Sequence, residues 1–184
     1  MNRWKLLILC LSVLVIISFS VRQDHFKEVI DRQSNEKIKS KLLDFKRKGI
    51  EKSVNTKKYN ADKIISDAMG FLNTPHRMGG TSAKGMDCSG LVMVVHQSQE
   101  ITLPHSSQEQ ARYGSIIPFS DQLKPGDLVF FYDSYKTSNF ITHSGIYIGN
   151  EDFIHTSNSK GVMISKINDP SYWGPRFLFG TRLK

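Results

Sequence analysis

Hydrophobic and polar residues follow three different patterns along this chain. The first is an uncharged apolar run from Leu6 to Phe19, preceded by Arg3 and Lys5. A basic start, an apolar stretch and small residues at its end are typical of a secretory signal peptide. The run is shorter than the roughly 20 residues of a membrane span. We therefore predict that residues 1–20 are a signal peptide or, where they are not cleaved, a membrane anchor.

The second pattern covers residues 21–58, which are highly charged and carry only narrow apolar stripes. Within the stripes, apolar residues recur at intervals of three and four, as helices require: Phe26, Val29 and Ile30, then Ile38, Leu42 and Phe45. We predict a helical or flexible spacer here, with its stripes packing on the folded domain rather than on a partner.

The third pattern begins at residue 59, where the apolar residues take the spacing of a folded domain. Helical spacing predicts helices over residues 61–72, 88–97 and 108–113, the first of them ended by Asn73-Thr74-Pro75. Glycines and small polar residues over 79–85 indicate a flexible loop that leads into the second helix.

Segments with strand character fill the rest of the chain. They are rich in β-branched and aromatic residues and are bounded by turn residues: Asp127–Tyr132, Ile141–Ile148, Phe153–Thr156, Gly161–Ser165 and Phe177–Arg182. Helices first and an antiparallel sheet afterwards indicate an α+β architecture. We predict one α+β domain over residues 59–184, with N-terminal helices packed on a sheet of about five to six strands.

The chain is basic, with 25 Lys and Arg against 17 Asp and Glu and a formal net charge of +8. Such a surface suits an anionic polymer, a membrane face or nucleic acid, or is simply solvated. For an exported chain we expect anionic cell-wall material, and not nucleic acid, as the partner.

Cys88 is the residue with the clearest chemical role. The other cysteine, Cys10, lies in the predicted leader, so Cys88 of an exported chain has no internal disulfide partner. It starts a predicted helix between Asp87 and Ser89, where backbone N–H groups and the helix dipole favour a thiolate. A buried structural cysteine is the commoner fate of a lone thiol, but the polar neighbours favour a nucleophile here.

Two histidines downstream complete the parts of a thiol hydrolase, in which an imidazole handles the protons of the nucleophile. Strand alternation places His143 and His155 on one face if the hairpin between them has an odd number of loop residues, for instance Gly149-Asn150-Glu151. Gly145 then faces His155, and His143 lies diagonally within reach of an imidazole–imidazole hydrogen bond.

A zinc site is the rival use of cysteine and histidine. The chain has no C-x-x-C or H-x-x-x-H pair to supply further ligands. We therefore expect neither a metal nor a cofactor.

Several ordered motifs together resemble the NlpC/P60 family of papain-like cysteine peptidases, which hydrolyse peptides of bacterial cell walls. The matching segments run in the family's order over about residues 60–184: Thr74-Pro75 to Gly79-Gly80-Thr81, Asp87-Cys88-Ser89-Gly90, Ser107-x-x-Gln110, Leu123 to Phe131, Thr142 to Tyr147, Phe153-Ile154-His155, Ser159 to Met163 and Tyr172-Trp173. A single D-C-S-G motif is weak, whereas the ordered set is specific. The chain is most similar to the small NlpC-like envelope enzymes of Gram-negative bacteria.

The resemblance implies a role for each candidate residue. Cys88 would be the nucleophile, His143 the general base and His155 the residue that orients the base. Three more residues match positions that line the substrate cleft and that in some members hold the free amino terminus of a stem peptide: Asp87, Ser89 and Ser107. The Asp87 carboxylate could pair with an ammonium group, act as the N-cap of its helix, or do both.

Two residues depart from the family pattern. His76 stands where a tyrosine usually follows the proline, and His105 replaces a frequent arginine ahead of Ser107. His76 would contact substrate, assist in oxyanion binding or fill the space of the tyrosine. Both changes bear on substrate preference more than on the nucleophile.

The resemblance thus implies an exported endopeptidase of the periplasm or cell envelope, anchored to the inner membrane if residues 1–20 are retained. It would cut the γ-D-glutamyl–diaminopimelate or the D-alanyl–diaminopimelate bond of peptidoglycan stem peptides through a Cys-His-His triad and an acyl-enzyme. Two alternatives stay open: a non-catalytic cell-wall-binding module, and an acyl or amide transferase on the same scaffold.

Overall fold

The computed structural model describes residues 24–183, so the predicted leader lies outside the described part of the chain. Its centre is a six-stranded antiparallel sheet with the strand order β3-β8-β4-β5-β6-β7. The strands are β3 (Ser115–Ile117), β4 (Leu128–Tyr132), β5 (Ile141–Gly149), β6 (Asp152–Ser157), β7 (Gly161–Lys166) and β8 (Phe177–Arg182). The predicted α+β fold is confirmed, and within this six-stranded sheet the three-residue strand β3 is the one that escapes prediction.

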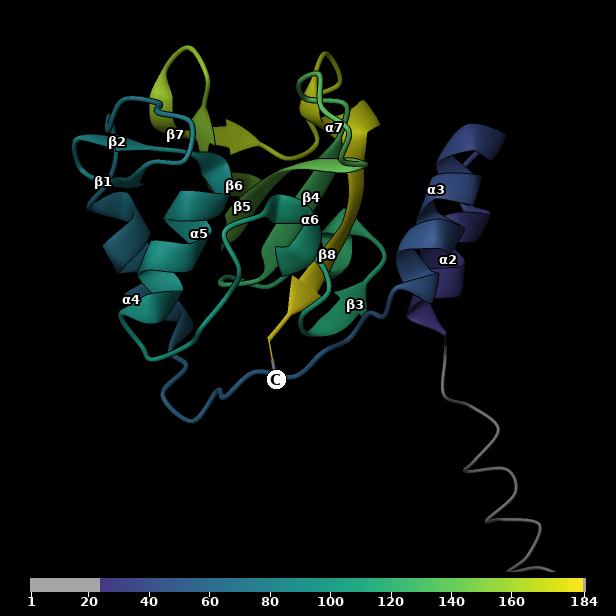
Figure 1. The fold of residues 1–184 in the computed structure, drawn as a ribbon, viewed down its shortest axis with the longest axis horizontal. Coiled ribbons are helices and arrows are strands. Elements are labelled where there is room, and N and C mark those ends of the chain that lie inside the picture. Colours follow the sequence, from purple (N-terminus) through teal and green to yellow (C-terminus); the bar gives the residue numbers. More distant parts are fainter. Residues whose placement is uncertain (1–23, 184) are drawn as a thin grey trace, which may run out of the picture.

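Two groups of helices pack on this sheet (Figure 1). One group consists of α4 (Ala61–Met69) and α5 (Cys88–Gln97), and α5 contacts β5 and β6. The other consists of α2 (His25–Asp31) and α3 (Glu36–Arg47), and α2 contacts β3. A continuous hydrophobic core joins both groups to the sheet, with Ile64, Leu91, Phe26, Leu42, Phe130 and Ile154 among its buried members.

The N-terminal helices α2 and α3 fold against the sheet, as their apolar stripes predict. Phe26 of α2 is 1% exposed, and its ring meets that of Phe179 edge-on with 5.4 Å between the centroids. Arg32, the C-cap of α2, donates hydrogen bonds to the carbonyl oxygens of Pro118 and Leu178. These contacts make residues 24–48 part of the folded body.

A second arginine, Arg112, ties α3 to the segment between α6 and β3. Arg112 Nη1 donates to the carbonyl oxygens of Phe45, at 3.0 Å, and Gly49, at 2.7 Å. Its guanidinium also lies 4.2 Å from the centre of the Phe45 ring.

Among residues 24–183, no helix is long and apolar enough to cross a membrane.

Three local elements differ from the sequence-based expectation. α4 ends at Met69, because Gly70 caps it and residues 70–72 form turns. The loop that we expected to be flexible forms a short antiparallel hairpin of β1 (Thr81–Ser82) and β2 (Gly85–Met86). α6 (Ser107–Gln110) is shorter than predicted and has Ser106 as its N-cap.

The hairpin between β5 and β6 has a two-residue turn, and our expectation of an odd loop is wrong. Asn150 and Glu151 both have positive φ angles, of 51° and 65°, and Gly149 pairs with Asp152. Two such residues are typical of the tight turns that match the twist of a hairpin. A register shift after Tyr147 adds the extra residue that the turn lacks, so the alternation between the histidines is preserved.

Candidate active site

Cys88 is the first residue of α5, as the sequence predicts. Asp87 caps the helix, because its Oδ1 accepts the N–H of Gly90 at 2.7 Å. A side chain at position 90 has no room, since a Cβ there would lie 2.2 Å from the carbonyl oxygen of Gly80. This close approach holds the preceding loop against the first turn of α5, where Cys88 is 9% exposed.

The thiol of Cys88 is enclosed rather than open to solvent. Its Sγ lies 3.5 Å from Ser107 Oγ, the one side-chain partner that it has within residues 24–183. Burial raises the pKa of the Cys88 thiol; the hydrogen bond from Ser107 opposes the shift, and the charge of Asp87 adds to it. The helix terminus alone favours a thiolate, but here burial favours the neutral thiol until a base takes its proton.

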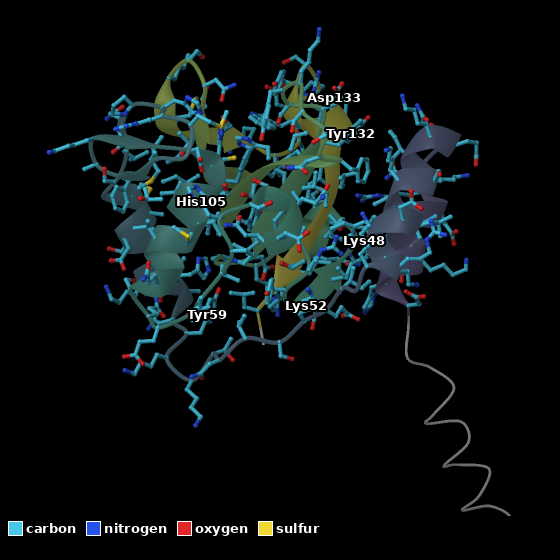
Figure 2. The ribbon with its side chains drawn as sticks, viewed as in Figure 1. Lys48, Lys52, Tyr59, His105, Tyr132 and Asp133 are labelled. Carbon is cyan, nitrogen blue, oxygen red and sulfur yellow. The ribbon has the colours of Figure 1, made fainter. Side chains whose placement is uncertain are left out.

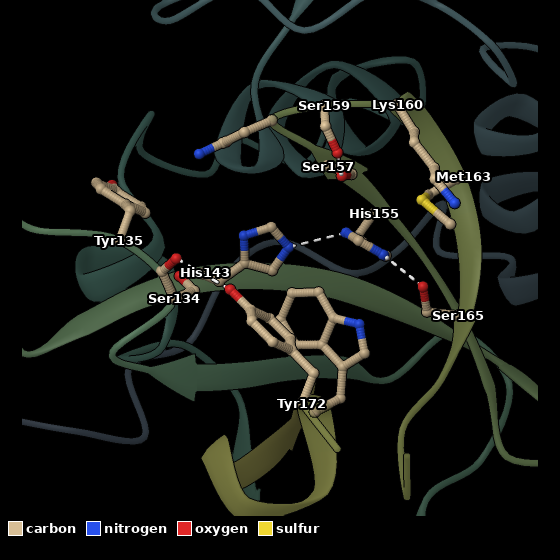
Figure 3. A pocket seen from close by; sticks show the side chains of 12 residues that line it. Ser134, Tyr135, His143, His155, Ser157, Ser159, Lys160, Met163, Ser165 and Tyr172 are labelled. Atoms are coloured by element: carbon tan, nitrogen blue, oxygen red, sulfur yellow. Dashed lines mark hydrogen bonds between the residues drawn. The ribbon is translucent and has the colours of Figure 1, made fainter. Parts of the chain in front are cut away.

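His143 and His155 meet in the hydrogen bond that strand alternation predicts (Figure 3). His143 Nε2 lies 3.0 Å from His155 Nδ1, and His155 Nε2 lies 2.9 Å from Ser165 Oγ of β7. If His143 accepts a proton on Nδ1, its Nε2–H donates to His155, and the Nε2–H of His155 donates to Ser165. The two hydrogen bonds then run in one direction, from His143 through His155 to Ser165.

Both imidazoles are buried, and burial decides their protonation. His143 is 5% exposed and His155 is 1% exposed. Burial, followed by the charges of His155 and His76, holds the pKa of His143 well below its ordinary value. Burial also lowers the pKa of His155 to about 4. Both rings are therefore neutral near pH 7, and His143 is free to accept a proton.

Aromatic side chains of a second hydrophobic cluster, which includes Phe153 and Trp173, fix the imidazole rings of His143 and His155. The centroid of Trp173, in α7 (Trp173–Arg176), lies 4.9 Å from that of His143 and 4.8 Å from that of His155. Phe153 stacks on His155 at 4.7 Å. These apolar contacts restrict the orientation of both imidazoles and exclude water from their hydrogen bond.

Two adjoining pockets open beside the histidines. The first, the Cys88 pocket, has a volume of about 310 Å³ and is lined by Cys88, His143, His76, Asp87, Ser89 and Ser107, among others. The second, the His155 pocket, has a volume of about 360 Å³ and includes His155 and Ser165. His143, Tyr135 and Asn158 line both pockets. Every predicted site residue thus lies on this cleft.

A buried chain of polar side chains runs from the partner of Cys88, Ser107, back to α5. Ser107 Oγ lies 3.0 Å from Ser144 Oγ, and the Ser144 hydroxyl donates to Gln110 Oε1 at 2.9 Å. The Gln110 amide in turn donates to the carbonyl oxygen of Ser89 at 2.8 Å. The chain therefore closes back on α5 one residue after Cys88, and it fixes the position of Ser107.

Asp87 accepts further hydrogen bonds besides the one from the N-terminus of α5. Its Oδ2 accepts the N–H of Gly79 at 2.7 Å, and its Oδ1 accepts the Ser89 hydroxyl at 3.0 Å. The Nε2 atom of His105, a residue labelled in Figure 2, lies 2.9 Å from Asp87 Oδ1. The residue that replaces the frequent arginine of the family pattern thus contacts this carboxylate. The half-buried His76 lines the Cys88 pocket close to the β2 residue Met86, with which it forms a β-bridge.

Three residues of the cleft had no role in our sequence-based interpretation. Ser165 ends the histidine chain, and Tyr135 and Asn158 flank His143 where the two pockets meet. Tyr135 and Asn158 lie in loops, and the pairing of β6 with β7 brings Ser165 to His155. None of these three positions is recognisable from a local sequence pattern.

The NlpC/P60 family pattern matches residues 73–182 of this chain, so α2 and α3 lie outside the match. The probable peptidoglycan endopeptidase LytE of Bacillus subtilis is 42% identical over 123 residues, which are 67% of this chain and 34% of that protein. Murein DD-endopeptidase MepS/Murein LD-carboxypeptidase of Escherichia coli K12 is 43% identical over 116 residues, which are 62% of this chain and 58% of that protein. The match thus spans less than two thirds of either relative.

The fold comparison agrees with the sequence comparison. A crystal structure of an NlpC/P60 family protein from Bacillus cereus superposes with a TM-score of 0.61 and 31% identity, covering 68% of this chain and 40% of that one. The family pattern covers more than half of the residues, and the fold is that of a solved family member. The chain therefore belongs to the NlpC/P60 family.

Proposed function

We propose that this chain is an exported cysteine endopeptidase that hydrolyses peptide bonds in peptidoglycan stem peptides. The observation that carries the proposal is the hydrogen bond between His143 Nε2 and His155 Nδ1, which leaves His143 Nδ1 for Cys88 in their shared pocket. The substrate class is supported by LytE and MepS, whose names describe endopeptidases of peptidoglycan and murein.

The reaction begins when His143 Nδ1 takes the proton of the Cys88 thiol while the sulfur attacks the carbonyl carbon of the scissile bond. Protonated His143 gives this proton to the leaving amine, the C–N bond breaks, and a thioester remains on Cys88. Water then attacks the thioester and passes a proton to His143. The C–S bond breaks, the acid product leaves, and the sulfur regains its proton from His143.

The negative oxygen of the tetrahedral intermediate needs hydrogen-bond donors. The N–H of Cys88 is suited to this role, because N–H groups of the first helical turn have no partner within the helix. His76 lines the same pocket and is our candidate for the second donor.

The Cys88 pocket would hold the acyl side of the substrate. Asp87 is the acidic residue of its lining, and we propose that it attracts the free amino terminus of a stem peptide while it caps α5. Ser89 and Ser107 would add hydroxyl contacts beside it. The γ-D-glutamyl–diaminopimelate and the D-alanyl–diaminopimelate bond are the two candidate bonds in such a substrate.

An envelope location accompanies this function. The basic start and apolar run of residues 1–20 support export, with the segment either removed or retained as an anchor in the inner membrane. The net charge of +8 suits work among anionic wall polymers.

The deciding experiment incubates the full chain with purified muropeptides and identifies the products by mass spectrometry. We expect fragments with new free termini, and their masses name the bond. Cys88→Ala is the control and should release nothing. Products in which an added amine replaces water would instead indicate a transferase. Intact muropeptides together with retained binding to cell walls would overturn the proposal in favour of a binding module.

A further inference from the structure

The two pockets of the cleft take different parts of a substrate. In the proposed reaction Cys88 keeps the acyl part, and His143 protonates the leaving amine. The leaving fragment must therefore extend from His143 away from Cys88. The His155 pocket lies on that side, since it is lined by His143 and His155 but not by Cys88.

The charges of the two pockets are opposite. Asp87 is the acidic residue of the Cys88 pocket. Lys160 is the residue of the His155 pocket with a permanent charge, because burial keeps His143 and His155 neutral. Figure 3 places Lys160 at the rim near Met163, on the His155 side. The cleft thus has an acidic residue at one end, in contact with His105, and a lysine at the other.

Lys160 has no acidic partner within residues 24–183. The nearby lysine of β7, Lys166, is by contrast paired with Asp152 at 3.0 Å. Asn158 and Ser159 lie beside Lys160 in the same lining and offer an amide and a hydroxyl. An exposed ammonium group with these neighbours is suited to a carboxylate ligand.

The turn that carries Lys160 is fixed relative to the nucleophile. Gly161 has a φ of +70°, and a Cβ there would lie 2.1 Å from the carbonyl oxygen of Thr74. Val162 N–H donates to that same oxygen at 2.8 Å, and Asn73 N–H donates to the carbonyl oxygen of Val162 at 2.9 Å. The segment before α5 and the β6–β7 turn are therefore held together.

We propose that Lys160 recognises a free carboxylate on the leaving fragment, so that the His155 pocket selects substrates that release an amine bearing a carboxylate. This inference rests on the proposed function, which sets the direction of the substrate. Stem peptides fit it, because their amino acids carry free carboxylates.

The test compares two synthetic peptides that differ only in the leaving fragment, which ends in a carboxylate in one and in a carboxamide in the other. For the native full chain we expect kcat/KM to be about tenfold higher for the carboxylate, mainly through KM, as a charged hydrogen bond provides. Lys160→Gln should remove this preference, and Lys160→Glu should reverse it. Lys48→Gln, at the end of α3, is the matched control (Figure 2).

An unchanged preference in Lys160→Gln would overturn the inference. The same peptides are also measured for binding to Cys88→Ala protein, with and without Lys160→Gln, by calorimetry. This arm needs no turnover, so a native chain that cleaves neither peptide would refute the proposed function while binding still decides the role of Lys160. Equal affinity of the Cys88→Ala protein for the carboxylate and the carboxamide peptide would then count against the proposed role of Lys160.

Discussion

The Nε2 atom of His155 lies 2.9 Å from the hydroxyl oxygen of Ser165, on the neighbouring strand β7. When the Ser165 oxygen accepts the Nε2–H of His155, the Nδ1 of His155 is unprotonated and can accept a hydrogen bond from His143. The orientation of His143, the proposed general base, thus depends on a serine two side chains away from the sulfur.

Replacing Ser165 with alanine should leave the Nε2–H of His155 without a partner. A buried unsatisfied donor costs about 1–3 kcal/mol, and we expect kcat to fall roughly tenfold with little change in KM. Ser165→Thr keeps the hydroxyl and should restore most of the rate. Steady-state kinetics on one muropeptide measure both variants, and an equal loss in both would assign Ser165 a packing role only.

The reactivity of Cys88 should follow its burial. Because burial raises the pKa of the thiol, the rate of alkylation by iodoacetamide should keep rising with pH past about 8.5, the ordinary thiol value. Since the pKa of His143 is lowered, His143→Ala should alter this profile little. A rate that is already at its plateau near pH 6 would instead reveal a thiolate–imidazolium pair.

A methyl group at position 90 should disturb the start of α5. The Cβ of Gly90→Ala would lie 2.2 Å from the carbonyl oxygen of Gly80, and overpacking of this kind costs about 3 kcal/mol. We expect a lower Tm and a loss of activity, because Cys88 sits in the same turn. Gly70→Ala is the milder comparison, since its Cβ would lie 3.2 Å from the backbone carbonyl oxygen of Asp67. Equal Tm values for the two variants would contradict the predicted clash.

Arg112→Ala should destabilise the attachment of α3. The side chain of Arg112 is 3% exposed, and its loss removes a donor from the carbonyl oxygens of Phe45 and Gly49. The Phe45 oxygen then keeps the N–H of Lys48 as a donor. We expect the free energy of unfolding to fall by about 3 kcal/mol, measured by urea denaturation. Arg47→Ala, whose side chain is 79% exposed, should change it by less than about 1 kcal/mol.

Local patterns predict the centre of the site well. Helical spacing and an acidic N-cap place Cys88 at the start of α5, and strand alternation places His143 and His155 on one face. The hairpin between them shows the limit of such reasoning. For both histidines to lie on one face, the hairpin needs one extra residue between them. Only the structure shows that this residue lies in a bulge after Tyr147 and not in the turn.

Contacts between distant segments could not be predicted in this way. Ser165 reaches His155 through the register of β6 with β7, and Trp173 reaches both histidines from a short helix near the C-terminus. Burial is likewise a property of the assembled fold. It reverses the protonation expected for a cysteine at a helix terminus, which a linear motif cannot indicate.

The packing of α2 on the sheet limits how far this protein could work from a membrane. If residues 1–20 remain embedded, only residues 21–24 separate them from the folded body, since α2 begins at His25. Four extended residues reach at most about 14 Å, far less than a free spacer over residues 21–58 would allow. A retained leader would therefore keep the folded body close to the bilayer surface, whereas cleavage would let it reach distant layers of the wall.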